Sequence, residues 1–189
     1  EVGHYLPDWR PNSDYRLNVS GQSSLGGGVL LELSHELDYL SWIFGSVHSV
    51  QGSLMNTNSL DIDVEDLVAV VLKIKAPNGD SLIGSLHMDM LQRAPCRVCR
   101  AVGSDATLEC DLSSGNIKIF DRSRNTGEEV FRSTSQDRNL MYKKQLMEFF
   151  NSLDGVETVS ATGVEGVKTL QLINGIKLSS ETGQRVIIS

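Results

Sequence analysis

The feature that most constrains the fold of this chain is a long stretch in which apolar and polar residues alternate. From Val47 to about Phe131, six segments show a period of two: 47–55, 67–75, 81–90, 97–102, 107–112 and 116–120. That period is typical of strands with one buried face. Asn78-Gly79 and Ser114-Gly115 are turn sequences that join antiparallel neighbours. We therefore expect an antiparallel meander.

One of these segments is apolar on both of its faces. Leu67–Leu72 reads Leu-Val-Ala-Val-Val-Leu, without a polar residue at either set of alternating positions. A strand of this kind is typical of a sheet that is covered on both sides. We expect helices to cover one face of the sheet and a second subunit to cover the other.

A helix is predicted directly before the strands. The glycine triplet 26–28 leads into Val29–Phe44, and Gly45 follows. Within this segment bulky apolar residues recur every three or four positions, at Leu30, Leu33, Leu37, Leu40 and Phe44. This spacing is typical of one amphipathic helix that ends at a glycine.

Two further helices are predicted near the end of the chain. Asn139–Leu153 has helical spacing, and Thr162 with Glu165 forms a capping-box pattern for a helix that runs to about Ser180. A short strand, 186–188, follows. Together the elements predict an α+β fold: a large open, mainly antiparallel sheet with helices packed on one face and the other face available for oligomerisation.

Composition argues against several classes of partner. The 189 residues carry 17 basic and 24 acidic side chains, a net charge of −7, with no run of five or more like charges. Nucleic-acid binding needs a clustered basic surface, so we expect no nucleic-acid partner. No apolar run approaches the roughly 20 residues that span a bilayer, so we expect no membrane partner. The odd number of cysteines, three, suits a reducing compartment, and we expect a cytoplasmic protein.

The best candidate for catalysis is a polar stripe on the first predicted helix. Glu32, His35 and Asp38 are spaced by three residues, which places them on one helix face just after the glycines. A carboxylate beside an imidazole fixes its tautomer and suits it to proton transfer near neutral pH. The alternative is a surface histidine on an ordinary amphipathic helix.

The opening stretch, Tyr5–Leu25, is predicted to be a loop of irregular backbone with bulky side chains. Aromatic and basic residues gather there and could line a sugar or ligand pocket: Tyr5, Trp9, Arg10, Tyr15 and Arg16. The alternative is that the aromatic rings simply pack. A second basic group could bind an anion or form a solvated strand edge: Arg93, Arg97 and Arg100, beside Ser85, His87 and Asp89.

Two other motifs resemble functional motifs in their residues but not in their spacing or context. The glycine triplet lacks the spacing of a nucleotide-binding loop, and we interpret it as a place where backbone packs closely at a helix start. Cys96 and Cys99 have C-x-x-C spacing, but residues three apart in a strand point to opposite faces. We therefore expect neither a metal site nor a redox motif there.

The glycine triplet, His35, Asp38 and Gly45 together resemble a pattern of the glucose-fructose oxidoreductase, inositol dehydrogenase and MocA-like family (Gfo/Idh/MocA). That pattern reads roughly G-G-G-x-L-x-D-x-G-x-H-x-x-D, with an apolar stretch and a glycine after it. Three closing segments are also similar to the family, so nearly the whole chain resembles its carboxy-terminal domain: 142–153, 160–166 and 182–186. The opening Tyr-Leu-Pro-Asp-Trp-Arg and the segment 86–93 resemble a branch associated with nucleotide-sugar or surface-polysaccharide pathways.

The resemblance implies an NAD(P)-dependent oxidoreductase that acts on a sugar or sugar nucleotide. Family members have an amino-terminal Rossmann domain and a carboxy-terminal α+β domain, whose sheet commonly forms the subunit interface. Residues 1–189 would then be the substrate-binding and oligomerisation domain. The chain begins with Glu1 and not Met, and we expect the Rossmann domain, which would bind most of the NAD or NADP, to precede it.

The resemblance also assigns roles to single residues. His35 matches the family's histidine, Asp38 the acid three residues beyond it, and Glu32 stands where the family usually has Asp. The spacing from Glu32 to His35 is three residues where the family has four. Residues expected to hold the sugar are Tyr5, Trp9, Arg10, Tyr15 and Arg97.

One family element is missing from this chain. The catalytic lysine of the family lies in a Glu-Lys-Pro motif of the Rossmann domain, and the first lysine here is Lys73. We therefore expect the isolated domain to be inactive. The alternative function is a non-catalytic sugar-binding or scaffold domain with the same fold.

Overall fold

The computed structural model describes residues 1–123, 127–133, 139–155 and 161–188. Ser160, part of one closing segment that resembles the family, lies outside the described residues. The chain divides into two units, one formed by Glu1–Cys96 with Val164–Ser189 and the other by Arg97–Gly163. We describe each unit by itself and call them the first and the second unit.

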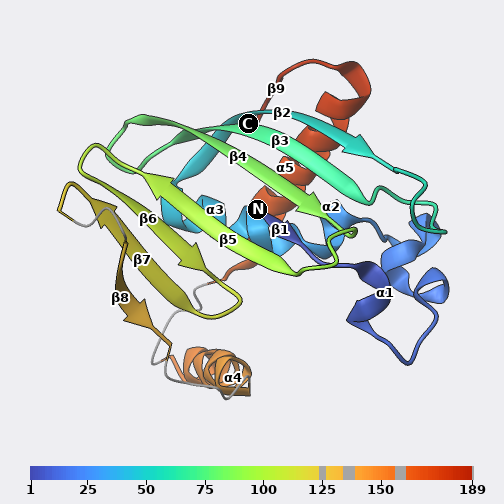
Figure 1. Cartoon of the computed structure of the whole chain (residues 1–189), viewed down its shortest axis with the longest axis horizontal. Coiled ribbons are helices and arrows are strands. Elements are labelled where there is room, and N and C mark those ends of the chain that lie inside the picture. The colour runs from blue at the N-terminus through green and yellow to red at the C-terminus, as the bar shows by residue number, and fades with distance from the viewer. Residues whose placement is uncertain (124–126, 134–138, 156–160, 189) are drawn as a thin grey trace. The chain divides into compact units, whose positions relative to one another are not determined.

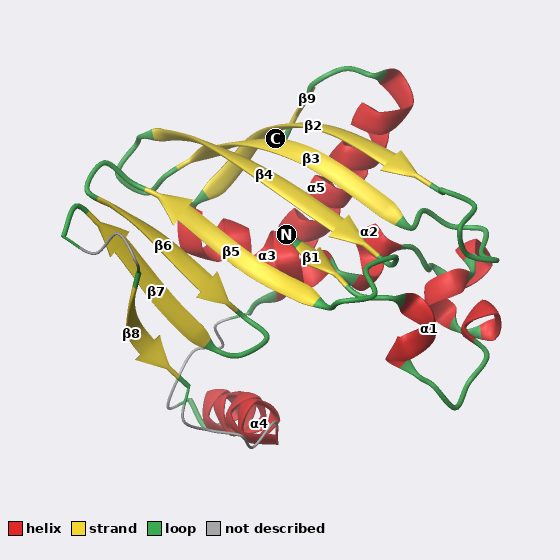
Figure 2. Cartoon of the chain, in the orientation of Figure 1, coloured by secondary structure: helices red, strands yellow, loops and turns green. Residues whose placement is uncertain are grey.

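The first unit is built on a sheet with the strand order β1-β4-β3-β2-β9 (Figures 1 and 2). The strands are β1 (Val2–Gly3), β2 (Ser46–Met55), β3 (Leu67–Lys75), β4 (Ser81–Asp89) and β9 (Val186–Ile187). β1 runs parallel to β4, and all other neighbours are antiparallel. The turn Asn78-Gly79 joins β3 to β4, as its sequence predicts.

Three helices cover one face of this sheet (Figure 1): α2 (Val29–Glu32), α3 (Ser34–Phe44) and α5 (Gly163–Thr182). Leu30, Leu37 and Ile176 from these helices are fully buried in one apolar core with β-strand residues such as Val68 and Met88. Burying each such side chain contributes about 1.5–3 kcal/mol. This packing ties the helices to the sheet.

On the opposite face of the sheet, which we call the open face, the side chains of β3 are exposed. Along β3, burial alternates: Val68, Val70, Leu72 and Ile74 are buried, and the residues between them are exposed. Val71, on the open face, is 50% exposed. The prediction that helices cover one face is confirmed, and a second subunit on the other face stays a prediction.

The predicted single helix over Val29–Phe44 is wrong in one respect, because the structure has two helices there. The backbone at Leu33 leaves the helical conformation (φ −104°, ψ 24°) and separates α2 from α3. The apolar spacing survives the break, since the five predicted core residues all belong to or pack against the core. No glycine or proline marks the break, so the sequence gives no signal for it.

The outer edge of β2 is closed in two ways. β9 pairs with Ser49 and Val50. Beyond Val50, side chains of helix α5 bind the backbone of β2. Gly52 N donates to Ser179 Oγ at 3.0 Å, and Leu54 N donates to Ser180 Oγ at 2.8 Å. Side chains of a helix therefore hold backbone groups that a neighbouring strand would otherwise pair.

The opening stretch contains more local structure than an irregular loop. It holds α1 (Leu6–Trp9) and three 3₁₀ turns: η1 (Tyr15–Leu17), η2 (Val19–Gly21) and η3 (Ser23–Leu25). The loop before β3 fastens it, because Asp63 accepts hydrogen bonds from the backbone and hydroxyl of Ser23, each at 2.7 Å. These bonds lower the pKa of the Asp63 carboxyl, the hydroxyl having the larger effect.

The second unit is a meander of antiparallel strands followed by a helix. Its elements are β5 (Cys96–Val102), β6 (Ala106–Asp111), β7 (Asn116–Asp121), β8 (Glu128–Arg132) and α4 (Asn139–Leu153). One face of the meander carries an ion pair between Arg100 and Glu109 at 2.5 Å. β8 lies in the alternating stretch but was not among the six predicted strands.

The fold class is as predicted, α+β with an open, mainly antiparallel sheet and helices. Helix α4 has the predicted bounds, and α5 begins directly after Thr162. Among the described residues, no helix has the length and apolar character needed to cross a membrane.

Candidate functional site

His35 lies in the first turn of α3 with its side chain 54% exposed. Its Nε2 is 3.2 Å from Oε1 of Glu36, whose side chain is only 1% exposed. A buried carboxylate at this distance attracts one ring nitrogen and restrains the ring's orientation. The nitrogen that is left for another partner is Nδ1. The site therefore presents an accessible imidazole that is held from the protein side.

The structure does not bring Glu32 and Asp38 to His35. Glu32 belongs to α2, on the other side of the break at Leu33, so the three residues do not form a stripe on one helix. Within the described residues, the Glu32 carboxylate makes no hydrogen bond or ion pair, while its backbone N donates to Gly28 O at 3.0 Å. Asp38 Oδ1 instead accepts a hydrogen bond from Thr169 Oγ1 of α5 at 3.2 Å. Neither acid therefore contacts His35 directly, as the predicted orienting roles would require.

Glu36 is the residue that sequence reasoning missed. It directly follows His35 and therefore falls outside the three-residue spacing that selected Glu32, His35 and Asp38. The apolar spacing could have indicated its burial. Leu33 and Leu37 are buried, and Glu36, which stands between them, lies near the same helix face. A carboxylate on the buried side of a helix is rare and points to a partner.

The glycine triplet positions α2 through close backbone contacts. A Cβ at Gly27 would lie 2.2 Å from the carbonyl oxygen of Val19, and Gly28 has φ +109°. The start of α2 is filled by Glu65, whose backbone oxygen accepts from Val29 N at 3.1 Å and whose Oε1 accepts from Leu30 N at 3.2 Å. The helix start therefore holds a carboxylate of the chain itself, in agreement with our interpretation of the triplet as close backbone packing.

The predicted sugar-binding aromatics are partly engaged in packing. Tyr5, Trp9 and Tyr15 all pack against the core. Trp9 Nε1 donates to the carbonyl oxygen of His4 at 3.0 Å, and the guanidinium of Arg93 lies 3.5 Å above the Tyr5 ring. These contacts fit the alternative of simple packing, and they leave the predicted substrate role untested.

The two predicted arginines lie in different units. Arg10 is exposed at the end of α1, and within the described residues its guanidinium makes no hydrogen bond or ion pair. Arg97 lies in β5 of the second unit, and its backbone oxygen accepts from Leu112 N at 2.9 Å. Of the residues predicted to hold the sugar, Arg10 therefore offers an exposed guanidinium to a ligand.

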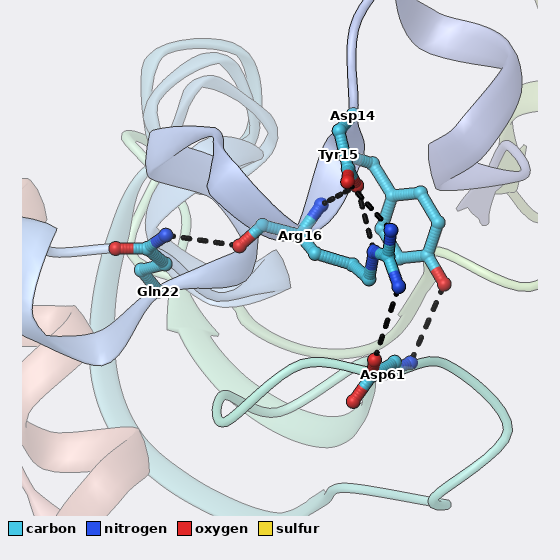
Figure 3. A network of polar contacts seen from close by, with 5 residues as sticks. All are labelled: Asp14, Tyr15, Arg16, Gln22 and Asp61. Carbon is cyan, nitrogen blue, oxygen red and sulfur yellow. Dashed lines mark hydrogen bonds and ion pairs between the residues drawn. The ribbon is translucent and has the colours of Figure 1, made fainter.

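Arg16, by contrast, is used by the opening stretch itself (Figure 3). Its Nε and Nη2 donate to Asp14 at 2.8 and 2.6 Å, and Nη1 lies 3.6 Å from Asp61 Oδ2. The Arg16 guanidinium lowers the pKa of the Asp14 carboxyl through these hydrogen bonds. Tyr15 joins the same network, because its hydroxyl accepts from Asp61 N at 3.4 Å.

Asp89, at the end of β4, is a buried residue that holds the chain directly after the strand. Its carboxylate accepts from the backbone of Leu91 and Gln92, each at 2.8 Å, and from Gln92 Nε2 at 2.7 Å. His87 Nε2 lies 3.0 Å from the second carboxylate oxygen. The carboxylate therefore stabilises the turn after β4.

A shallow hollow of about 530 Å³ lies near the hairpin end of the first unit's sheet. Its lining includes His48, Lys73, Lys75 and Ile83, and none of the predicted site residues. In the part of the chain that the structure describes, no group of three or more His, Cys, Asp or Glu side chains is arranged to hold a metal ion.

The comparison with known families decides the identity of this fold. Residues 4–188 match the C-terminal alpha/beta domain of the Gfo/Idh/MocA oxidoreductase family. The chain belongs to this family. No curated protein matches it significantly.

Several solved structures share the fold of this Gfo/Idh/MocA domain. Levoglucosan dehydrogenase in complex with NADH and L-sorbose has a TM-score of 0.81 at 14% identity, over 100% of this chain and 57% of that chain. A putative oxidoreductase from Thermotoga maritima has a TM-score of 0.75 at 19% identity, over 99% and 53%.

UDP-N-acetylglucosamine 3-dehydrogenase GnnA from Acidithiobacillus ferrooxidans has a TM-score of 0.70 at 17% identity, over 96% of this chain and 52% of that chain. At such identities these likenesses show the fold alone. The chain spans little more than half the length of each of these proteins.

Proposed function

We propose that this chain is the substrate-binding and oligomerisation domain of an NAD(P)-dependent oxidoreductase that acts on a hydroxyl or carbonyl group of a sugar or sugar nucleotide. The observation that carries the proposal is the accessible His35 imidazole beside the buried Glu36 carboxylate. Family membership and the sugar dehydrogenases among its structural neighbours support the substrate class.

In the proposed mechanism, His35 exchanges a proton with the reacting oxygen of the sugar. The nicotinamide supplies or accepts the hydride. Glu36 acts as a positioning residue, since it draws Nε2 toward the protein and leaves Nδ1 for the substrate. Asp38 takes no direct part in this step, because its carboxylate accepts a hydrogen bond from Thr169 and does not contact His35.

NAD or NADP would be held mainly by another domain. The glycine triplet offers no phosphate cradle here, because Glu65 already satisfies backbone amides at the start of α2. The helices carry exposed apolar residues away from their core face, with Trp42 of α3 80% exposed and Val167 and Leu170 of α5 also exposed. We propose that the cofactor domain packs there, since a helix that is apolar on both sides is usually covered on both.

For the open face of the sheet we propose a second copy of the chain. Val71 and Ile83 are large apolar side chains that are exposed on β3 and β4, and a partner on this face would bury them. We further propose that the oligomer works in the cytoplasm, where the chain's three cysteines would stay reduced.

The test is His35→Ala in the full-length enzyme, with turnover and substrate affinity measured separately. We expect turnover to fall by about 100-fold or more, the usual contribution of general acid-base catalysis. The matched control is His48→Ala, an exposed histidine of β2, which should leave turnover unchanged. Normal turnover of His35→Ala with intact substrate binding would remove His35 from the mechanism.

Glu36 is tested with the isosteric substitution Glu36→Gln. A positioning role predicts a lower kcat with a nearly unchanged KM and a displaced pH profile of kcat, while a purely structural role would lower only stability. The 189-residue chain alone is expected to show no NAD(P)-dependent turnover of sugars.

A scaffold domain without catalysis is the second candidate, favoured by the missing contact between Glu32 and His35. Coding sequence upstream of Glu1 separates the two. G-x-G-x-x-G with a later Glu-Lys-Pro would support the enzyme, and a start codon just before Glu1 would support the scaffold.

A further inference from the structure

Two thiols face each other across neighbouring strands of the second unit. Cys99 of β5 pairs with Cys110 of β6 in the antiparallel register. Leu112 N donates to Arg97 O, which makes the odd-numbered positions of β5 the hydrogen-bonded ones. Cα atoms of such a pair lie about 5.5 Å apart. That separation falls within the range of roughly 4.4–6.8 Å that disulfides bridge.

The surroundings of this pair are mostly apolar. Cys110 is opposed on its other side by Ile117 of β7, and the next facing pair of the same kind is Ala101 with Leu108. Arg100 and Glu109, one position along, project to the other face.

The third cysteine is placed differently. Cys96 lies in the same strand as Cys99, three residues earlier, so their side chains point to opposite faces of the meander. The C-x-x-C pair is thus separated by the strand, as its sequence predicts. The pair that the fold brings together, Cys99 with Cys110, is eleven residues apart in sequence and was not predicted.

We propose that Cys99 and Cys110 form a dithiol that a peroxide oxidises reversibly to a disulfide between β5 and β6. The sulfur of one thiol attacks hydrogen peroxide, the O–O bond breaks, and a sulfenic acid and one water result. The sulfur of the second thiol then displaces the hydroxyl group, which leaves as a second water while the S–S bond forms. The two thiols lose two electrons and two protons, and the peroxide takes up both.

The geometry also sets the character of the bond. Cβ atoms of opposed residues lie about 4.5–5.5 Å apart, at the longer end in hydrogen-bonded pairs, whereas a disulfide needs about 3.5–4.5 Å. The strands must therefore draw together slightly, and a disulfide under such strain is readily reduced. Burial raises the pKa of the Cys110 thiol, and Asp111 adds to the effect, so we expect oxidation to accelerate as the pH rises.

The test treats the 189-residue chain with hydrogen peroxide, blocks free thiols and maps disulfide-linked peptides by mass spectrometry. We expect a Cys99–Cys110 link with Cys96 still free, and full reversal by dithiothreitol. Cys96→Ser is the matched control and should give the same link. Cys99→Ser and Cys110→Ser should abolish it.

Oxidation of the chain unfolded in urea distinguishes the fold from mere proximity in sequence. There the shorter loop between Cys96 and Cys99 closes more easily, so that pair should dominate. A native disulfide that includes Cys96, or sulfinic acids without any disulfide, would overturn the proposal. The map of the unsubstituted native chain decides the question even if a serine variant fails to fold.

Discussion

Substituting Gly27 by alanine tests how the glycine triplet positions α2, the short helix that precedes the helix with His35. The added Cβ would lie 2.2 Å from the Val19 carbonyl oxygen and 2.8 Å from that of Ser20. Both oxygens belong to backbone, and they accept hydrogen bonds from Gln22 N and Gly28 N, each at 3.1 Å. The clash can therefore be relieved only by moving these bonded segments.

The cost follows from these contacts. Overpacking of a fixed site costs about 1–3 kcal/mol, and each disturbed hydrogen bond adds roughly 1 kcal/mol. We expect Gly27→Ala to lower the free energy of unfolding by about 3 kcal/mol. Gly26→Ala is the matched control, because a Cβ there meets nothing within 4 Å and only its φ of +81° is strained. That strain costs about 1–2 kcal/mol.

Urea unfolding followed by far-UV circular dichroism measures both variants. For a chain of this size, a loss of about 3 kcal/mol corresponds to a fall in Tm of roughly 6–12 °C. If Gly27→Ala were no less stable than Gly26→Ala, the close approach of backbone at Gly27 would not constrain the loop. The packing argument for the triplet would then be refuted.

Three further predictions concern the first unit. Asp89→Ala leaves the amides of Leu91 and Gln92 without their acceptor and should cost about 3 kcal/mol in urea unfolding; a cost below roughly 1 kcal/mol would contradict this role of Asp89. Leu37→Ala, at a fully buried position, should cost about 2–5 kcal/mol, whereas Trp42→Ala should stay within roughly 0.5 kcal/mol in this chain alone. The pKa of Asp63 is lowered, so its bonds to Ser23 stabilise the fold above the ordinary carboxyl pKa of 3.8, and this contribution is lost as the pH falls through the lower folded-state pKa. The stability difference between the unsubstituted chain and Ser23→Ala should therefore vanish in acid, and a difference that persists there would exclude the carboxylate as its source.

Local patterns predicted the elements of this fold well. Alternation located the strands, and the turn Asn78-Gly79 gave the β3–β4 hairpin, because both signals act between near neighbours in sequence. The break at Leu33 was not predictable, since no glycine or proline marks it and the apolar spacing continues across it. The strand β9 is only two residues long, yet it was predicted at 186–188 from its short apolar run.

The candidate site was predicted only in part. His35 could be singled out because a histidine with acids three residues before and after it is visible in the sequence, but its contact with Glu36 became evident only from the structure. The facing pair Cys99 and Cys110 depends on the register of two strands, which the sequence does not specify beyond the turn between them. Contacts between distant segments, such as Asp38 with Thr169, have no local signal at all.

The serine hydroxyls of α5 at the border of β2 have a consequence for self-association. An unpaired strand border is a template on which foreign chains can polymerise into fibrils. At Gly52 and Leu54 the template is already occupied by Ser179 and Ser180, which belong to a helix and cannot propagate a ladder. Growth of the sheet therefore stops at this margin, and the chain is guarded there against amyloid-like recruitment.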